Sequence, residues 1–354
     1  MAGQAWWQTE VVYQIYPRSF ADSNGDGIGD LPGITARIDH LVALGVGVVW
    51  LSPVYRSPMA DNGYDISDYC DIAPEFGTLA DFDALTTALH ARGIKLVMDL
   101  VVNHCSDQHP WFEQGRQSRG HPWHDFFIWG EPAADGGPPN NWEACFSGPA
   151  WTFNPPTGEY YLHLFSPQQP DLDWRNPRLR AQVHEVLRFW LARGVDGFRM
   201  DVINLISKPW DAQGRLPDAP VVQPGPVQPA FAMVVHGPQL MDHLREMRQV
   251  MQAALPEGQA LLTVGEAPIA TTAQAVEITH PDTGALSMVF QFEHMDLDNL
   301  PGQPKWALKP LDLVDLKRSL ARWQQALADS GWNSLYFGNH DQPRIVSRWG
   351  DDGP

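Results

Sequence analysis

Gly197-Phe198-Arg199-Met200-Asp201 is one of three short apolar runs in this chain that end on a carboxylate. The other two, residues 261–266 and 335–341, end on Glu266 and Asp341. Each run is typical of a buried β-strand, and the acid follows where the strand leaves the core. Charged side chains are seldom placed there without a partner or a task. Because the carboxyl ends of the strands in a β/α barrel form one floor, the three acids predict a shared site.

The chain alternates between candidate strands and amphipathic helices. The predicted strands are Val11–Tyr16, Val46–Leu51, Lys95–Val102, Phe198–Val202, Leu261–Val264, Met288–Phe292 and Ser334–Phe337. The predicted helices between them include Ile34–Leu44, Leu79–Arg92, Leu179–Arg193, Gln239–Ala254 and Leu313–Ala328. This alternation predicts parallel strands joined by crossover helices, and the near-continuous apolar strands indicate burial on both faces.

The predicted strands are one short of a closed barrel. We therefore expect the α/β fold class, with a (β/α)8 TIM-type barrel that lacks its last strand. Either the barrel is open or the chain is a fragment of a longer protein. We favour a fragment, because an open barrel would leave two strand edges unpaired.

The stretch from Cys105 to Asp173 breaks the alternation. It is rich in Pro, Gly, Trp and His, and it is too long for an ordinary loop between a strand and a helix. We expect residues 105–173 to form a small subdomain inserted after the third strand, which leaves residues 1–104 and 174–354 for the barrel. Such an insertion would wall a cleft at the carboxyl ends of the strands, and we expect the Pro-rich stretch Pro217–Pro229, after the fourth strand, to be a loop on the same face.

The composition is that of a globular protein, and it narrows the choice of partners. The 354 residues are 44% hydrophobic and 19% charged. A formal net charge of −18 disfavours nucleic acids and anionic membranes, because both are polyanions. The 15 Trp residues are unusually many. Their side chains could stack on the faces of sugar rings or fill the core, and composition alone does not decide between the two.

The cysteines and the N-terminus bear on location. Cys70, Cys105 and Cys145 fit neither a zinc spacing nor a disulfide framework. Residues 1–10 lack the basic start and apolar core of a signal peptide, and no later segment is apolar enough to span a membrane. We therefore predict a cytoplasmic protein without a membrane partner.

The paired acids suit the cleavage of a glycosidic bond, which needs one ionised carboxylate and one protonated acid. Arg199 lies two residues before Asp201, so on a strand both side chains point the same way. We expect this cation to keep Asp201 ionised, and desolvation after an apolar run to keep Glu266 protonated. Asp341, next to His340, would stabilise positive charge in the transition state. Alternatively, each acid caps the helix that follows its strand. This alternative is less favourable for three such acids together than for one alone.

These runs, with others, resemble the signature regions of the α-amylase family of glycoside hydrolases, and in it the oligo-1,6-glucosidase and α-glucosidase group. The resembling stretches are Asp99–His104, Gly197–Asp201, Val264–Glu266, Asn339–Asp341 and Gln169–Asp173. Asp173 departs from the group, which usually has Asn at this position. The resemblance runs from Trp6 to the C-terminus. It implies an eighth strand, a C-terminal β-sandwich and a further sugar-binding Arg beyond residue 354.

The resemblance implies a role for each matching residue. Asp201 would be the nucleophile, Glu266 the general acid/base and Asp341 the transition-state stabiliser. The implied binders of the sugar in the first subsite are Tyr64, Asp65, His104, Arg199 and His340. On local grounds alone, Asp65 would be a turn residue and His104 a helix cap or a core histidine.

Residues 22–30 form a second polar constellation. Oxygen-bearing side chains at alternate positions, with glycines that allow a tight turn, suit a hard cation. Position twelve of the run is Gly33, whereas an EF-hand has a bidentate Glu there. The resemblance implies a structural Ca²⁺ bound by Asp22, Asn24, Asp26, Asp30 and the Ile28 carbonyl. The alternative is an Asp/Asn/Gly turn without metal, and we expect no organic cofactor.

Three features bear on the activity. Val202, after the implied nucleophile, is typical of α-1,6-acting relatives, whereas maltases usually have Thr or Ala; this biases the linkage without fixing it. Residues 290–298 resemble the hydrolases and lack the Arg-rich loop of sucrose isomerases. The insertion should close one end of the cleft. We expect a retaining exo-α-glucosidase that acts on isomaltose and isomalto-oligosaccharides, with α-1,4 bonds as a further possibility.

Three alternatives stay open. A glucosyl-transferring or sucrose-isomerising enzyme would use the same acids, and an α-1,4-preferring maltase would differ in which oligosaccharide it favours. A catalytically silent family member would act as a binding partner, like the heavy subunits of amino-acid transporters. Those proteins carry a membrane anchor and have lost catalytic acids, whereas this chain keeps all three acids.

Overall fold

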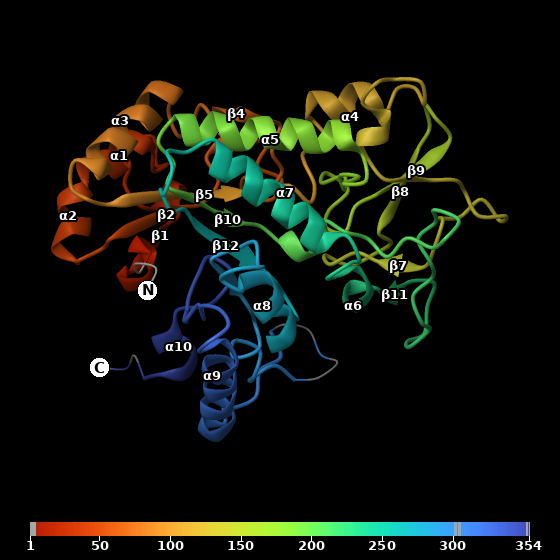
Figure 1. The fold of residues 1–354 in the computed structure, drawn as a ribbon. Helices are drawn as coiled ribbons and strands as arrows, with labels where there is room; N and C mark the ends of the chain where they lie inside the picture. The colour runs from red at the N-terminus through yellow and green to blue at the C-terminus, as the bar shows by residue number, and fades with distance from the viewer. Residues whose placement is uncertain (1–4, 301–302, 304–305, 352, 354) are drawn as a thin grey trace.

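A curled sheet of six parallel strands forms the centre of the chain (Figure 1). The computed structural model describes residues 5–300, 303, 306–351 and 353. In spatial order the strands are β1 (Val12–Ile15), β2 (Val48–Leu51), β5 (Lys95–Leu100), β10 (Gly197–Met200), β12 (Leu262–Glu266) and β13 (Met288–Phe290). Neighbours pair in parallel throughout. The predicted alternation and the parallel, curled barrel architecture are confirmed, with β1 and β13 at the edges of the sheet.

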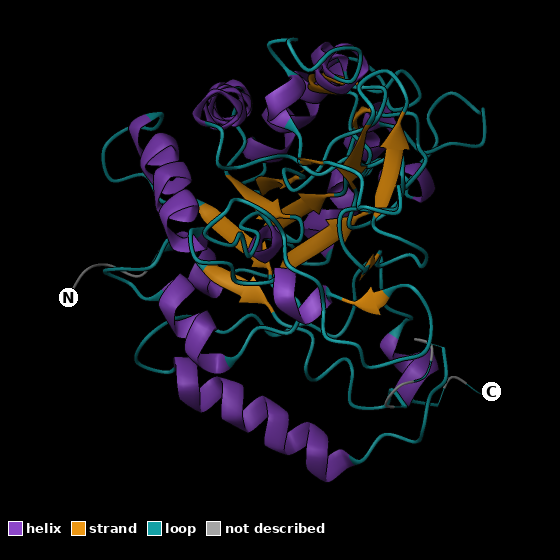
Figure 2. Cartoon of the chain, turned by 90° about the vertical axis from the view of Figure 1, so that its right-hand side faces the viewer, coloured by secondary structure: helices purple, strands orange, loops and turns teal. Residues whose placement is uncertain are grey.

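Helices surround this sheet (Figure 2). They are α1 (Leu31–Ala36), α2 (Ile38–Ala43), α3 (Leu79–His90), α5 (Pro177–Ala192), α7 (Leu240–Ala253), α8 (Thr272–Thr279), α9 (Leu313–Leu327) and the short α6 (Phe231–Val234) and α10 (Ile345–Trp349). α5 shows why they form: Asn176 caps its first turn, Pro177 opens it, and its buried residues recur on one face. One of these, Trp190, donates a hydrogen bond to the Tyr69 carbonyl at 2.8 Å, which ties the helix to residues 68–72, outside the central sheet.

Two predicted elements differ from the structure. Residues 334–337 are not a strand; Leu335 is 65% exposed. The carbonyl of Tyr336 accepts a hydrogen bond from the His294 side chain at 2.6 Å instead of joining a ladder. Residues 34–44 are two helices, because at Arg37 (φ −107°, ψ 9°) the amide bonds the Ile34 carbonyl three residues back and ends α1. α8 was not predicted, although Thr271 and Gln274 form a capping box at its start.

Residues 105–173 carry small elements of their own. They include α4 (Pro110–Gly115) and a three-stranded antiparallel sheet of β6 (Trp129–Gly130), β9 (Glu159–Leu162) and β8 (Trp151–Asn154). β7 (Trp142–Glu143) pairs with β11 (Gln228–Pro229), which lies at the end of the Pro-rich stretch. The two stretches therefore lie together (Figure 1), as expected of a loop on the same face, whereas the domain boundaries stay a prediction. β3 (Tyr55–Arg56) and β4 (Asp68–Ile72) form a further antiparallel pair.

The core accounts for many of the aromatic residues. Trp50, Trp111, Trp142, Trp151, Trp174, Trp190 and Trp323 are buried. The three cysteines are free, as the sequence predicted. Within the described ranges, no helix has the length and apolar character that crossing a membrane would require.

One buried histidine should make the fold sensitive to acid. His109 is 6% exposed, its Nδ1 accepts the Trp111 amide at 3.1 Å at the start of α4, and burial lowers its pKa to about 3. An unfolded histidine binds its proton near pH 6.5, so below that pH the unfolded state binds more protons than the folded state. Between pH 6.5 and 4.5, His109 should cost about 2–3 kcal/mol of the free energy of unfolding.

His109→Asn keeps a capping oxygen and removes the titration. We expect urea unfolding at pH 7 and at pH 4.5 to show a smaller loss of stability in this variant than in the unmodified chain. His40→Asn, at an exposed position, is the matched control and should leave the acid-induced loss unchanged. Equal losses in His109→Asn and the unmodified chain would contradict the prediction.

Candidate active site

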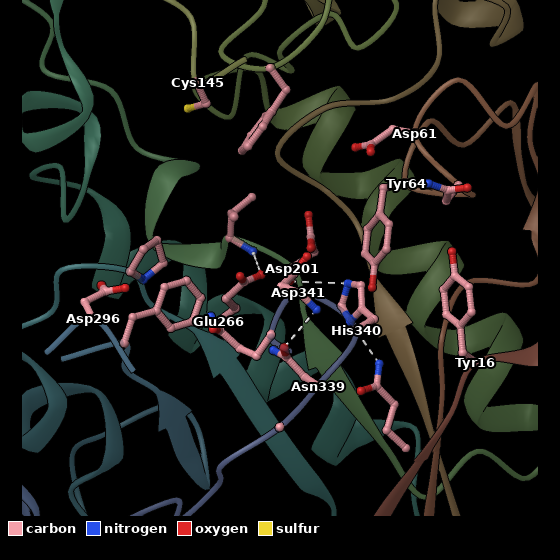
Figure 3. A pocket seen from close by; sticks show the side chains of 18 of the residues that line it. Tyr16, Asp61, Tyr64, Cys145, Asp201, Glu266, Asp296, Asn339, His340 and Asp341 are labelled. Carbon is pink, nitrogen blue, oxygen red and sulfur yellow. Dashed lines mark hydrogen bonds and ion pairs between the residues drawn. The ribbon is translucent and has the colours of Figure 1, made fainter. Parts of the chain in front are cut away.

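A cleft of about 1130 Å³ lies where the strands of the sheet end (Figure 3). Among the residues that line it are seven of the predicted site residues: Tyr64, His104, Asp201, Val202, Glu266, His340 and Asp341. Cys145, Phe146 and Phe165 line it from the inserted stretch, so this stretch does wall the cleft. Among the described residues, no Trp lines the cleft, so its aromatic lining consists of Tyr and Phe.

Arg199 holds three carboxylates together beneath this cleft. Its Nη1 donates to Asp99 Oδ1 at 2.6 Å and to Asp201 Oδ1 at 2.7 Å, and its Nη2 donates to Glu266 Oε2 at 2.5 Å. The guanidinium is 1% exposed and does not line the cleft, so it lies behind the acids. Arg199 and Asp201 point the same way from β10, as their spacing predicted.

The pKa of Asp201 contradicts our expectation. Burial raises the pKa of Asp201 well above that of an ordinary aspartate, and Glu266 and Asp99 raise it further. Arg199 opposes these effects without overcoming them. The expectation that Arg199 keeps Asp201 ionised was wrong, because burial, together with the nearby charges of Glu266 and Asp99, outweighs the charge of Arg199. The cluster therefore takes up a proton more readily than an isolated aspartate does.

Glu266, at the end of β12, is also held by the backbone. Its Oε2 accepts the Val202 amide at 3.0 Å in addition to Arg199. Val202 has the left-handed conformation φ 34°, ψ 41°, which is rare for a β-branched residue. This turn brings the backbone amide that follows Asp201 against the other acid.

His340 lies between two tyrosine rings at the side of the cleft (Figure 3). Its ring stacks on Tyr64 (5.2 Å, 6° between planes) and on Tyr16 (6.3 Å, 11°). Its Nδ1 lies 2.9 Å from Gln14 Nε2, and its Nε2 lies 3.4 Å from Asp341 Oδ2. The sequence did not predict Tyr16 or Gln14, although both sit at the end of β1, where barrel strands carry site residues.

His104 is a neutral member of the site. It is 1% exposed, its Nε2 donates to the Tyr64 carbonyl at 3.1 Å, and burial lowers its pKa to about 4. Asp173, which departs from the group's usual Asn, binds the Arg175 guanidinium at 2.6 Å and does not line the cleft. Its neighbour Asp171 pairs with the buried Lys208 at 2.7 Å, which ties the end of the insertion to the loop after β10.

Asp65 lies outside the cleft, contrary to its predicted place, and Asp61 lines it instead. Asp65 is 0% exposed and accepts the amides of Ala60 and Asp61 at 3.0 and 2.9 Å, so it shapes the loop. Asp61 Oδ2 accepts from Gln169 Nε2 at 2.8 Å, and burial raises the pKa of Asp61. The local signal for Asp65 as a turn residue was correct, whereas nothing in the sequence pattern singled out Asp61.

The polar loop at residues 22–30 folds around its own oxygens. Asp22 accepts the Gly25 and Gly27 amides at 2.7 and 2.8 Å, and these backbone bonds, that of Gly27 first, lower its pKa. Asp30 faces the interior, is 3% exposed and caps α1 through the Gly33 amide at 2.6 Å. Across the described part of the chain, no three His, Cys, Asp or Glu side chains are grouped so as to hold a metal. The side chains of Asp22, Asn24 and Asp26 still offer the oxygens a hard cation needs, so calcium stays a prediction.

The different places of Asp61 and Asp65 predict different effects on stability. In Asp65→Asn, an amide NH₂ replaces an oxygen that accepts backbone N–H groups, and we expect the free energy of unfolding to fall by about 1–3 kcal/mol. Asp61→Asn is the matched control, because its carboxylate faces the cleft, and its melting temperature should change little. A thermal melt in which both variants behave alike would contradict this placement.

The comparisons with known proteins agree with this geometry. Residues 14–354 match the family model described as alpha amylase, catalytic domain. The chain is 54% identical over 350 residues to an oligo-1,6-glucosidase of Parageobacillus thermoglucosidasius, covering 99% of this chain and 60% of that protein. A second oligo-1,6-glucosidase, of Halalkalibacterium halodurans, is 56% identical over 351 residues, with coverage of 98% and 60%.

Solved structures extend the comparison. A trehalose-6-phosphate hydrolase of Bacillus licheniformis has a TM-score of 0.92 at 44% identity, covering 99% of this chain and 60% of that one. The trehalulose synthase of Pseudomonas mesoacidophila has a TM-score of 0.89 at 40% identity, with coverage of 99% and 61%. The chain thus spans about 60% of the length of the relatives it matches. It belongs to the α-amylase family and carries that family's catalytic-domain sequence over almost its whole length.

Proposed function

We propose that this chain carries the catalytic centre of a retaining exo-α-glucosidase. The enzyme would hydrolyse α-1,6 glucosidic bonds at the non-reducing end of isomaltose and isomalto-oligosaccharides. The observation that carries the proposal is the pair Asp201 and Glu266, held on one buried guanidinium at the floor of the cleft. Because the chain spans about 60% of its relatives' length, the proposal concerns the whole protein.

In this mechanism Asp201 attacks the anomeric carbon while Glu266 protonates the departing oxygen, and a covalent glucosyl-enzyme forms. Glu266 then deprotonates water, which attacks the same carbon and releases glucose. Retaining enzymes hold their two carboxyls about 5–5.5 Å apart and inverting enzymes about 6.5–9.5 Å apart, so this mechanism requires the shorter separation between Asp201 and Glu266. Asp341 would stabilise the positive charge of the transition state.

Three acids share Arg199, so their protonation is coupled. The proposed mechanism requires that Asp201 is ionised when it attacks. The sugar in the first subsite would contact Tyr64, His104, His340 and, in place of Asp65, the cleft residue Asp61. Arg199 would act by orienting the acids, since it lies behind them.

A second candidate is glucosyl transfer, as in sucrose isomerisation. The similarity to a trehalulose synthase at 40% identity supports it, whereas the higher identity to two oligo-1,6-glucosidases favours hydrolysis. Both reactions would use the same acids and differ in whether water or a sugar accepts the glucosyl group. Product analysis on sucrose separates them, because transfer yields an isomeric disaccharide and hydrolysis yields only monosaccharides.

We expect glucose release from isomaltose to exceed release from maltose and to vanish in Asp201→Asn. In Val202→Thr the preference for isomaltose should fall by about tenfold, since one methyl-for-hydroxyl change is worth only about 1–3 kcal/mol. Asp61→Asn should weaken activity on both sugars without changing their ratio. Release from maltose alone would overturn the α-1,6 assignment, and activity that survives in Asp201→Asn would overturn the site.

We also propose that the loop at residues 22–30 binds a structural Ca²⁺, with oxygens from Asp22, Asn24 and Asp26. Calcium should raise the melting temperature of the unmodified chain after treatment with a chelator, because it binds only the folded loop. Asp26→Ala should abolish this shift. Asp135→Ala, an exposed turn aspartate that likewise accepts a backbone amide two residues on, is the control and should keep it. An equal melting temperature with calcium and with chelator would contradict the proposal.

A further inference from the structure

Three residues on the loops that follow β10 and β12 have positive φ: Val202, His236 and Ile269, at 34°, 52° and 51°. Two of them, Val202 and Ile269, are β-branched, and such residues rarely adopt this left-handed region. A strained conformation of this kind persists only where its surroundings hold it. Val202 follows Asp201 directly, and Ile269 lies three residues after Glu266, so the strain flanks both proposed reacting carboxyls. One buried side chain bonds His236 and the carbonyl of Pro268, the residue before Ile269.

That side chain is Asn204, which is 0% exposed. Its Nδ2 donates to the Pro268 carbonyl at 2.9 Å and to His236 Nε2 at 3.1 Å, and its backbone carbonyl accepts the His236 amide at 2.8 Å. Asn204 sits in the short 3-10 turn Ile203–Leu205, which begins at the strained Val202. One residue thus connects the segment after the nucleophile, the segment after the acid/base and the strained His236.

The chemistry of these bonds requires an amide. The Pro268 carbonyl only accepts, and His236 accepts through Nε2 because burial lowers its pKa to about 4 and keeps the ring neutral. The primary amide supplies two donors to two acceptors, which neither Asp nor Leu can do. Asn204 Oδ1 is buried and, among the described residues, receives no hydrogen bond. The contribution of this side chain is therefore directional and lies in the two bonds it donates.

We propose that Asn204 is a positioning residue that holds the loops of Asp201 and Glu266 in their strained, mutually bonded arrangement. The inference rests on the proposed function for its catalytic consequence. The link to the acids is the Val202 amide, which donates to Glu266 Oε2 at 3.0 Å from the residue at which the 3-10 turn of Asn204 begins. If the two donated bonds are lost, the turn can relax and Glu266 loses one of its two donors.

The test compares Asn204→Asp with Asn154→Asp in the same chain. Asn154 is a control that lies away from the cleft: it is 0% exposed and its Nδ2 donates to the Arg116 carbonyl and to Thr157 Oγ1, both at 2.8 Å, while its Oδ1 accepts from Arg116 Nε at 3.1 Å. We expect Asn204→Asp to lower kcat for isomaltose by about 100-fold with little change in KM, as for reacting groups displaced by about 1 Å. Asn154→Asp also removes two donated bonds and places a carboxylate beside Arg116, and it should leave kcat nearly unchanged.

Hydrogen–deuterium exchange of the peptide that contains Val202 gives a readout independent of activity. Protection of this peptide should fall in Asn204→Asp and persist in Asn154→Asp. If Asn204→Asp does not fold, Asn204→Leu takes its place, because leucine keeps the side-chain volume and has no hydrogen-bond donor. The expected results for Asn204→Leu are the same. If the unmodified chain releases no glucose, kcat gives no comparison between the variants, because the proposed function concerns the whole protein, and exchange alone decides the role of Asn204. Unchanged protection, or a kcat loss no larger than in Asn154→Asp, would overturn the inference.

Discussion

The guanidinium of Arg199 is the charge on which the active-site floor depends. A buried cation is costly unless it is paired, and Arg199 is paired with three acids. Its charge also faces the rings of Trp50 and Tyr64, at 5.3 and 5.8 Å from their centroids. The indole Nε1 of Trp50 and the hydroxyl of Tyr64 in turn donate to Asp99 Oδ2, at 2.9 and 3.3 Å. The cation, its counter-charges and these two rings therefore form one connected network. Removing the cation would leave several like charges buried against one another.

This network is built by strand register. Arg199 lies directly opposite Asp99 of β5 on one side and Val264 of β12 on the other, two residues before Glu266. Because successive side chains on a strand point to opposite faces, a slip of one residue would turn Arg199 away from its partners. The same pairing that completes the sheet therefore assembles the acids, and fold and site share one constraint. It also explains why the residue numbers of these partners differ by as much as 100 while their atoms lie within hydrogen-bond distance.

Much of this could be predicted from the sequence, because periodicity and strand-end acids are local signals. These signals predicted the six strands of the sheet and the long helices α3, α5, α7 and α9. They also predicted that Asp201, Glu266 and Asp341 line one cleft. The failures concern interactions between distant segments. Asp99 shares Arg199 with the other acids, and Asp61 lines the cleft where Asp65 was expected. At residues 334–337 a side-chain hydrogen bond replaces the bonds of a strand ladder. All three features depend on neighbours that no local pattern specifies.

Two departures from local preference lie beside the proposed reacting groups. Val202 and Ile269 are β-branched residues in a conformation that suits glycine, and they lie within three residues of Asp201 and Glu266. A glycine at position 202 would relieve the strain, but it would also loosen the start of the turn Ile203–Leu205. A side chain packed at the cleft wall limits that freedom, since Val202 is 8% exposed. The residue that donates its amide to Glu266 is thus also a strained one, and the stability this strain costs has to come from the packed sheet and helices around it.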